Sequence, residues 1–275
     1  MSANDPILRR RTKGWGCLAA LALLVSSSVH LSAQGALPVG FAYLRDVDPS
    51  IVQDIRYAGA DNFIGRRLPG YDGAECILRR DVAAALKQVQ SDLAASGLAL
   101  KVYDCYRPMR ATGAMVQWAS DGQSAVSTKR FFPRVNKNAL FALGYIAAHS
   151  QHSTGAAVDL TLIEAASPPP ASFDPTARYG PCTGEAAKRA PDNSLDMGTG
   201  YDCFDVMSHT GSSAITAEQK QRRAILLTAM ASRGFRNYRR EWWHFTYSRG
   251  GPRSAYDFPV RPRAASLQRE QGAGR

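Results

Sequence analysis

Two short segments of this 275-residue chain carry the side-chain types of a hydrolytic metal site. The first contains His152 and, seven residues later, Asp159, and the second is Glu-Trp-Trp-His at 241–244. Two histidines and one carboxylate can chelate zinc and leave its fourth position to a water, whose pKa falls to about 7. A neighbouring carboxylate can take the proton of that water during attack on a carbonyl. The grouping therefore predicts a zinc site of His152, Asp159 and His244, with Glu241 beside it.

Each of these residues alone also has an ordinary structural explanation. A single histidine or strand aspartate is more often structural than functional. The aromatic segment 240–247 is also typical of a core strand with a hydrogen-bonded histidine. In a regular strand Glu241 and His244 face opposite sides, so both reach one metal only if Glu241 lies at the strand entrance, a bend or a bulge. Spacing alone leaves this open, and the combination of the two segments favours the metal site.

Apolar periodicity and helix start and stop residues predict the elements that position these segments. Helices and strands alternate irregularly, which favours an α+β fold in which a small mixed or antiparallel sheet carries the zinc site and is packed by helices. The predicted elements are a helix over 81–96 stopped by Gly97, a strand over 98–104, a helix over 109–118, a buried helix over 138–148, and a helix after the capping box at Thr216 that ends near Gly234.

The strand predicted over 156–162 carries the candidate ligand Asp159. Its period of two places Val158, Leu160 and Leu162 on one face and Asp159 on the other, so Asp159 is expected on a polar side opposite the core. Gly155 permits a tight turn that brings His152 back over the Asp159 face.

The N-terminal segment has the composition of an export signal. Arg9, Arg10, Arg11 and Lys13 precede an uncharged run from Gly14 to Leu31, and small residues follow at 33–35. Its strongly apolar part is too short to span a bilayer comfortably, although an uncleaved anchor is an alternative. We therefore expect residues 1–35 to be a cleaved signal peptide, 36–262 a catalytic domain of an exported, periplasmic protein without a membrane span, and 263–275 a disordered basic tail.

The mature chain remains basic. Four basic residues and one acidic residue leave with the leader, so the formal net charge falls from +11 to +8. No helix-turn-helix, zinc-finger or RNA-stacking motif accompanies this charge, so no nucleic-acid partner is expected. An affinity for an anionic cell envelope and a simple solubilising surface are both consistent with it.

Four cysteines remain after the leader is removed, an even number that suits an oxidising compartment. They lack the paired spacing of a structural zinc site, so disulfides or buried thiols are expected. We predict a Cys182–Cys203 pair, because these residues bracket a loop rich in Gly, Pro and Asp, and a Cys76–Cys105 pair.

The motifs Ser-x-His-x-x-Gly-x-Ala-x-Asp at 150–159 and Glu-Trp-Trp-His at 241–244 resemble the VanX-type D-alanyl-D-alanine dipeptidases, which are zinc peptidases related to D,D-carboxypeptidases. The similarity extends from about residue 43 to 261 and includes Tyr-Arg-Pro at 106–108. It implies that His152, Asp159 and His244 bind one Zn2+ and that Glu241 is general base and then acid. It also implies that Arg107 stabilises the oxyanion.

A dipeptidase recognises both ends of its substrate. The resemblance implies that Asp202 binds the ammonium, although a shifted alignment would substitute Asp205 or Asp196. It also places Ser150, Tyr71 and Tyr57 around the substrate, and the two tyrosines are equally typical of core aromatics.

Three features depart from the family pattern. The connection from Ser167 to about Leu195 is longer than usual, Cys105 replaces a common Gly, and His149 and Gln151 are unusual neighbours of His152. His149 and the distant His209 are expected to have structural or supporting roles and not to bind the metal.

The resemblance therefore implies hydrolysis of D-alanyl-D-alanine, or a close D,D-dipeptide derived from peptidoglycan, to free amino acids. One alternative is a D,D-carboxypeptidase or endopeptidase acting on longer peptidoglycan peptides. Another is a non-catalytic, zinc-stabilised protein that binds the envelope.

Overall fold

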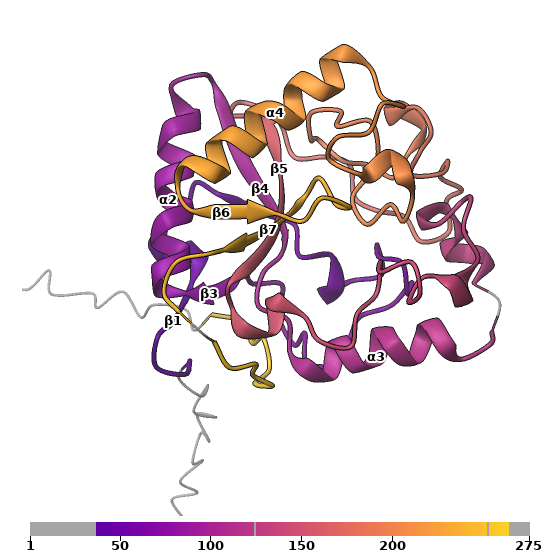
Figure 1. Cartoon of the computed structure of the whole chain (residues 1–275), viewed down its shortest axis with the longest axis horizontal. Coiled ribbons are helices and arrows are strands. Elements are labelled where there is room, and N and C mark those ends of the chain that lie inside the picture. The colour runs from indigo at the N-terminus through magenta and orange to yellow at the C-terminus, as the bar shows by residue number, and fades with distance from the viewer. Residues whose placement is uncertain (1–36, 124, 252, 264–275) are drawn as a thin grey trace, which may run out of the picture. The chain divides into compact units, whose positions relative to one another are not determined.

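A five-stranded mixed sheet forms the centre of the part described by the computed structural model, which comprises residues 37–123, 125–251 and 253–263 (Figure 1). The leader expected over 1–35, and all but the first residue of the tail expected over 263–275, lie outside these residues. The strand order is β2 (Val52–Gln53), β4 (Leu98–Asp104), β5 (Ala157–Glu164), β7 (His244–Tyr247) and β6 (Phe235–Asn237). Only β2 and β4 are parallel. The predicted α+β class with a small mixed sheet is confirmed.

Two long helices pack on this sheet. Helix α2 (Arg80–Ala94) contacts β4, helix α4 (Ala217–Ser232) contacts β5 and β6, and the two helices contact each other (Figure 1). Leu100 and Val102 of β4 and Leu160 and Leu162 of β5 are fully buried in this core. The remaining elements are β1 (Phe41–Tyr43), α1 (Leu44–Val47), β3 (Ile77–Arg79), α3 (Met109–Ser120) and the short 3-10 helices η1 (Arg56–Ala58), η2 (Val126–Phe131), η3 (Lys137–Ala139), η4 (Gln151–Thr154), η5 (Ala186–Lys188) and η6 (Val206–Ser208).

Most predicted elements are confirmed within a few residues, including the capping box at Thr216. The helix predicted over 138–148 is wrong, because only η3 and irregular turns occupy this stretch. Gly144 adopts a φ of 76°, which ends any right-handed helix there. Leu140 is buried whereas Phe141 and Leu143 are exposed, so the apolar residues form no continuous helical stripe.

The predicted alternation of β5 is confirmed, since Val158, Leu160 and Leu162 belong to the hydrophobic core and Asp159 faces polar partners on the other side, but this polar face is buried as well. Asp159 is 2% exposed and Thr161 is fully buried. The helices cover one face, and loop residues between 192 and 202 cover the other, where Tyr201 donates to Asp159. A carboxylate in this setting needs hydrogen bonds or a cation as compensation.

Both predicted disulfides are confirmed. Cys76 pairs with Cys105 and Cys182 with Cys203, at Cα–Cα separations of 5.3 and 5.5 Å. The bonds close loops with sequence separations of 29 and 21 residues. Loops of this size gain roughly 3 kcal/mol of stability from a cross-link, by restricting the unfolded chain.

A buried ionic cluster joins the polar face of the sheet to the loop around Asp192. Arg56 and Lys101 are 8% and 1% exposed, and the Asp192 carboxylate pairs with both. Tyr103 donates a further hydrogen bond of 2.7 Å to the same carboxylate. Burial alone would raise the pKa of Asp192, but Arg56 and Lys101 hold it well below its usual range.

We expect Asp192→Asn to lower the free energy of unfolding at pH 7 by about 2 kcal/mol, because it removes the nearest carboxylate partner of Lys101 and one of the three carboxylates paired with Arg56, which keeps Asp54 and Asp61. The folded-state pKa of Asp192 lies below its unfolded value. The stabilisation is therefore complete above about pH 4 and is lost as the pH falls through the folded-state value. Guanidinium denaturation of both proteins at pH 7 and at acid pH measures this. A difference that does not shrink in acid contradicts the assignment.

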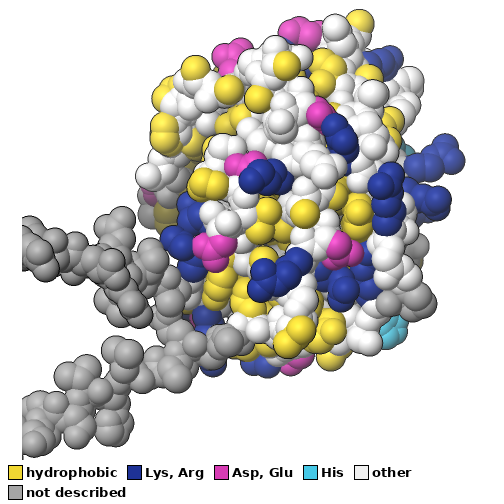
Figure 2. Space-filling model, turned by 90° about the vertical axis from the view of Figure 1, so that its left-hand side faces the viewer, with side chains coloured by type: hydrophobic (Ala, Val, Ile, Leu, Met, Phe, Trp, Pro, Cys, Tyr) yellow, Lys and Arg dark blue, Asp and Glu magenta, His cyan; other side chains and the backbone are white. Residues whose placement is uncertain are grey.

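The described surface is mixed in charge on the face shown in Figure 2, where Lys and Arg side chains are interspersed with Asp, Glu and hydrophobic side chains. Such a mixture is typical of a solvated, solubilising surface. Among the helices of the described ranges, none combines the length and apolar character that crossing a bilayer requires.

Candidate active site

His152 is positioned by a turn that only glycine can complete. Helix η4 begins after Ser150, whose hydroxyl oxygen accepts from the His152 amide, and it ends at Gly155 with a φ of 72°. A Cβ at Gly155 would lie 2.3 Å from a ring carbon of Phe41. On the other side, His152 Nδ1–H donates to the carbonyl of Cys105 at 2.7 Å. This bond fixes the tautomer and directs Nε2 toward β5.

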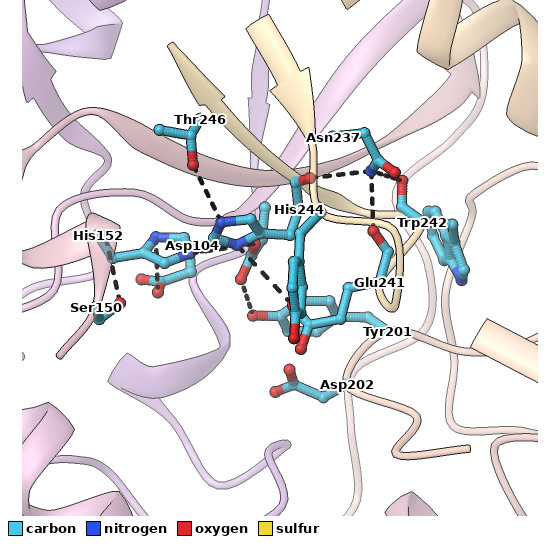
Figure 3. Close-up of polar contacts among 12 residues, drawn as sticks. Asp104, Ser150, His152, Tyr201, Asp202, Asn237, Glu241, Trp242, His244 and Thr246 are labelled. Carbon is cyan, nitrogen blue, oxygen red and sulfur yellow. Dashed lines mark hydrogen bonds and ion pairs between the residues drawn. The ribbon is translucent and has the colours of Figure 1, made fainter. Parts of the chain in front are cut away.

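Asp159 and His244 are directly opposite each other in the β5–β7 pairing, so their side chains point to the same side of the sheet. The His152 ring lies next to the His244 ring on this side (Figure 3). The mutual distances are 3.0 Å from His152 Nε2 to His244 Nδ1, 3.0 Å from His244 Nδ1 to Asp159 Oδ1, and 3.2 Å from His152 Nε2 to Asp159 Oδ1. Tetrahedral ligands bonded to zinc at 2.0–2.1 Å are separated by about 3.3 Å. The three atoms therefore match one face of a zinc coordination tetrahedron.

The protonation of the two rings also fits a cation. His152 Nδ1 carries the proton that Cys105 accepts, and His244 Nε2 lies 3.3 Å from the Thr246 hydroxyl, which can accept its proton. The remaining nitrogens then present lone pairs to each other and to a carboxylate. Burial lowers the pKa of His244, which favours its neutral form. Burial alone would raise the pKa of Asp159, and protonated imidazoles of His152 and His244 would lower it. With both rings neutral, a metal cation would have to stabilise the Asp159 carboxylate in their place.

Glu241 lies at the entrance to β7, one of the positions that the sequence left open. Its amide donates to Tyr238, and Asn237 Nδ2 donates to the carbonyls of Glu241 and His244 at 2.9 and 3.0 Å (Figure 3). These bonds hold a turn that places Glu241 Oε2 4.0 Å from His244 Nδ1. Burial, reinforced by the negative charges of Asp159 and Asp202, raises the pKa of Glu241. A carboxyl in this state suits proton transfer near neutral pH.

Arg107 is held beside the three ligands by Asp104. Its Nε donates to Asp104 Oδ2 at 2.9 Å, and its Nη2 lies 2.8 Å from the same atom and 3.9 Å from Asp159 Oδ2. A bulge in β4 makes Asp104, two residues after Val102, face Asp159 across the sheet. Tyr71 lies behind this pair, where its hydroxyl donates to Asp104 at 2.5 Å. Tyr71 does not line the cavity next to the site and instead supports the carboxylate that orients Arg107.

A cavity of about 280 Å3 opens in front of these groups. Tyr57, Ser150 and Asp202 line it, as do Arg107, Glu241 and the three candidate ligands. The Tyr57 hydroxyl donates to Asp202 Oδ2 at 2.8 Å, and among the described residues it is the only donor to this carboxylate. Burial and then Asp159 raise the pKa of Asp202, so an incoming cation is favourable there.

The alternative acids and histidines lie elsewhere. Asp205 pairs with Arg134, and Asp196 pairs with Arg189. Neither lines the cavity, so the placement favours Asp202 among the three aspartates. His149 lines the outer cavity but is exposed and does not belong to the three-ligand group, and His209 does not reach the cavity.

Three residues that hold the site together were not predicted from the sequence. Asp104 holds Arg107, Asn237 holds the Glu241 turn, and the Tyr201 hydroxyl donates to Asp159 Oδ2 at 3.0 Å. Asp104 was the most predictable of the three. It is a carboxylate at the end of a buried strand, directly before the Arg107 turn, and functional residues are common at such positions.

Comparisons with known proteins show the family to which the sequence belongs. A family model described as D-ala-D-ala dipeptidase, peptidase M15, matches residues 38–171 and 188–260. The D-alanyl-D-alanine dipeptidase of Enterococcus faecium is 30% identical over 226 residues, which are 82% of this chain and 100% of that protein. The one from Streptomyces coelicolor is 32% identical over 221 residues, 80% of this chain and 98% of that protein. The chain belongs to the D-ala-D-ala dipeptidase family and is a peptidase.

A crystal structure of the vancomycin resistance D,D-dipeptidase VanXYg in complex with a D-Ala-D-Ala phosphinate analog aligns with 75% of this chain and 66% of that chain. The sequence identity is 16% and the TM-score is 0.31, so this alignment adds no support to the assignment.

Proposed function

We propose that this chain hydrolyses D-alanyl-D-alanine, or a close D,D-dipeptide, with one zinc ion held by His152, Asp159 and His244. The observation that carries the proposal is the convergence of two imidazole lone pairs and a carboxylate oxygen within 3.2 Å of one another. Without a cation these groups would face each other unfavourably in a buried place. A bound zinc ion would supply Lewis-acid polarisation and lower the pKa of a water.

Glu241 is the proton carrier in this proposal. Its carboxylate takes a proton from the attacking water as the new carbon–oxygen bond forms at the scissile carbonyl. It then gives this proton to the leaving nitrogen as the carbon–nitrogen bond breaks. The 4.0 Å between Glu241 Oε2 and His244 Nδ1 leaves Glu241 within reach of a water beside the ligands. The raised pKa of Glu241 favours the first half of the transfer, in which its carboxylate accepts the proton.

Two residues that line the cavity suit the two ends of a dipeptide. Asp202 accepts from Tyr57 through one oxygen and has the other available for a substrate ammonium. Ser150 accepts through its oxygen from His152 and keeps its own hydrogen available for a carboxylate. A blocked amine would leave the buried Asp202 carboxylate without a cation, which disfavours longer peptides.

The direct test compares D-Ala-D-Ala with N-acetyl-D-Ala-D-Ala, using zinc-loaded enzyme. We expect hydrolysis of the free dipeptide and a loss of at least about 100-fold in kcat/KM on acetylation. Comparable rates on both would support the D,D-carboxypeptidase or endopeptidase alternative. No hydrolysis of either by folded, zinc-loaded protein would support the non-catalytic alternative.

Arg107 is the proposed oxyanion donor, because Asp104 engages one side of its guanidinium and leaves N–H groups for the substrate carbonyl. We expect Arg107→Ala to lower kcat/KM by 10²–10³-fold, about 3 kcal/mol of transition-state stabilisation. Steady-state kinetics on D-Ala-D-Ala measures this. Arg107→Lys, which keeps the charge but not the planar fork, should recover only part of the loss. Unchanged kcat/KM in Arg107→Ala would refute the role.

We also propose that the mature chain acts outside the cytoplasm, in the periplasm. The two disulfides support this, since such bonds persist in oxidising compartments. A peptidase placed there would meet dipeptides released from peptidoglycan. Mass spectrometry of the secreted protein would show cleavage near residue 35.

A further inference from the structure

Asp202 has an uncommon backbone conformation. Its φ is 54°, and it is the only residue other than glycine with a positive φ among those described. Aspartate is one of the few L-residues that adopts this region, at a modest steric cost that local contacts must offset. Asp202 is also 4% exposed, so a shift of its backbone would change the direction of a closely packed carboxylate.

The residues on either side of Asp202 are both fixed. Tyr201 donates to Asp159, and its ring stacks on Tyr103 with centroids 4.4 Å apart. Cys203 is fully buried and is bonded to Cys182. The Asp202 backbone is thus held between a stacked tyrosine and a disulfide (Figure 3 shows Tyr201 and Asp202 beside the histidines).

The disulfide joins two segments that dock side by side on η2. The Cys182 amide donates to the Arg130 carbonyl at 2.8 Å, and the Phe204 amide donates to the Phe131 carbonyl, also at 2.8 Å. A third bond of 2.9 Å runs from the Gly200 amide to the Cys182 carbonyl. The cross-link therefore fixes the chain on both sides of Asp202 to one place.

Cys182 belongs to a part of the chain outside the family pattern. The family model matches up to residue 171 and again from 188, and Cys182 lies between these limits. Neither Cys182 nor Cys203 lines the cavity. Any effect of this bond on catalysis must therefore pass through the backbone that it holds.

We propose that the Cys182–Cys203 disulfide is a positioning element that aims the Asp202 carboxylate at the substrate ammonium and so sets the preference for a free amino terminus. This inference rests on the proposed dipeptidase function. The segment 172–187 supplies one half of the bond and thereby takes part in substrate selection without touching substrate.

A double-mutant cycle tests the coupling. We expect C182S/C203S to raise KM for D-Ala-D-Ala by about tenfold with kcat changed far less, because the ground-state contact to the ammonium is misplaced. Asp202→Asn raises KM by itself, and adding C182S/C203S to it should raise KM less than about twofold further. C76S/C105S removes a cross-link of similar loop length, so its effect on KM should multiply with that of Asp202→Asn. If the effects of C182S/C203S and Asp202→Asn on KM multiply, the disulfide and Asp202 act independently and the proposal is overturned.

Amide hydrogen exchange separates this inference from the proposed function, since it needs no activity. C182S/C203S should speed exchange in residues 199–204 by at least about tenfold, and C76S/C105S should not. Unchanged exchange there overturns the positioning role even if the dipeptide is hydrolysed. If the wild-type protein binds zinc but does not hydrolyse the dipeptide, the proposed dipeptidase function is wrong. The exchange rates still show whether the disulfide positions the backbone of Asp202. If C182S/C203S does not fold, the same measurement is made on folded C76S/C105S protein. Of the two disulfides this variant keeps only Cys182–Cys203, which is then reduced chemically.

Discussion

Glu241→Gln is expected to lower kcat for D-Ala-D-Ala by 10²–10⁴-fold, the usual range for loss of a general base and acid. Glutamine keeps the size and hydrogen-bonding ability of the side chain but cannot take a proton from water or return it to the leaving nitrogen. KM should change little, because Asp202 and Ser150 remain to bind the substrate. Initial rates over a range of dipeptide concentrations, measured with zinc-loaded protein, give both constants.

The control for this variant is its metal content. Glu241 Oε2 lies 4.0 Å from His244 Nδ1 and is not one of the three grouped ligands, so Glu241→Gln should still bind one zinc per chain. Glu241→Asp keeps the carboxylate but withdraws it, and should retain part of the activity. A Glu241→Gln enzyme with wild-type kcat would show that another group carries the proton.

Removal of zinc is expected to abolish hydrolysis, since no other group in the cavity could activate water to the same extent. Dialysis against a chelator followed by assay measures the loss, and adding back zinc should restore the rate. The fold should survive, because two disulfides and a core of packed helices and sheet do not depend on the metal. The Tm should nevertheless fall, since a ligand at 1,000 times its Kd adds about 4 kcal/mol of stability.

A matched variant makes this test specific to the site. His244→Ala removes one of the three ligands, and it should lose tight zinc binding and activity together. His209→Ala removes a histidine that lies outside the cavity and should keep both. Full activity in metal-free wild type, or in His244→Ala, would exclude the proposed chemistry.

The grouping of the candidate ligands was predictable because short-range geometry determines it. Gly155 forces the turn that returns His152 toward β5, and the β5–β7 register places Asp159 opposite His244. The conformation of a tight turn and the register of a strand pair leave the side chains that they carry few alternative positions. Glu241 lies in the turn before β7, which begins at His244. The rule that residues three apart in a strand face opposite sides therefore does not apply to this pair.

Other features depend on contacts that no local pattern contains. The bulge that turns Asp104 toward Arg107 is a property of the β4–β5 pairing. Asp159 is buried because the loop 192–202 covers its face of the sheet. Asp192 and Tyr201 hold this loop in place through hydrogen bonds with Tyr103 and Asp159. The apolar run at 138–148 looked helical, but Gly144 and the alternation of buried and exposed residues gave turns. Tertiary packing decided each of these.

The most direct test of the metal site is an anomalous difference map, recorded at the zinc edge from crystals of the wild-type protein prepared with one equivalent of zinc. We predict one strong peak, at about 2.0–2.2 Å from His152 Nε2, His244 Nδ1 and an Asp159 carboxylate oxygen. A peak elsewhere, or folded protein without a peak, would contradict the assignment of these three residues and the proposed function that depends on it.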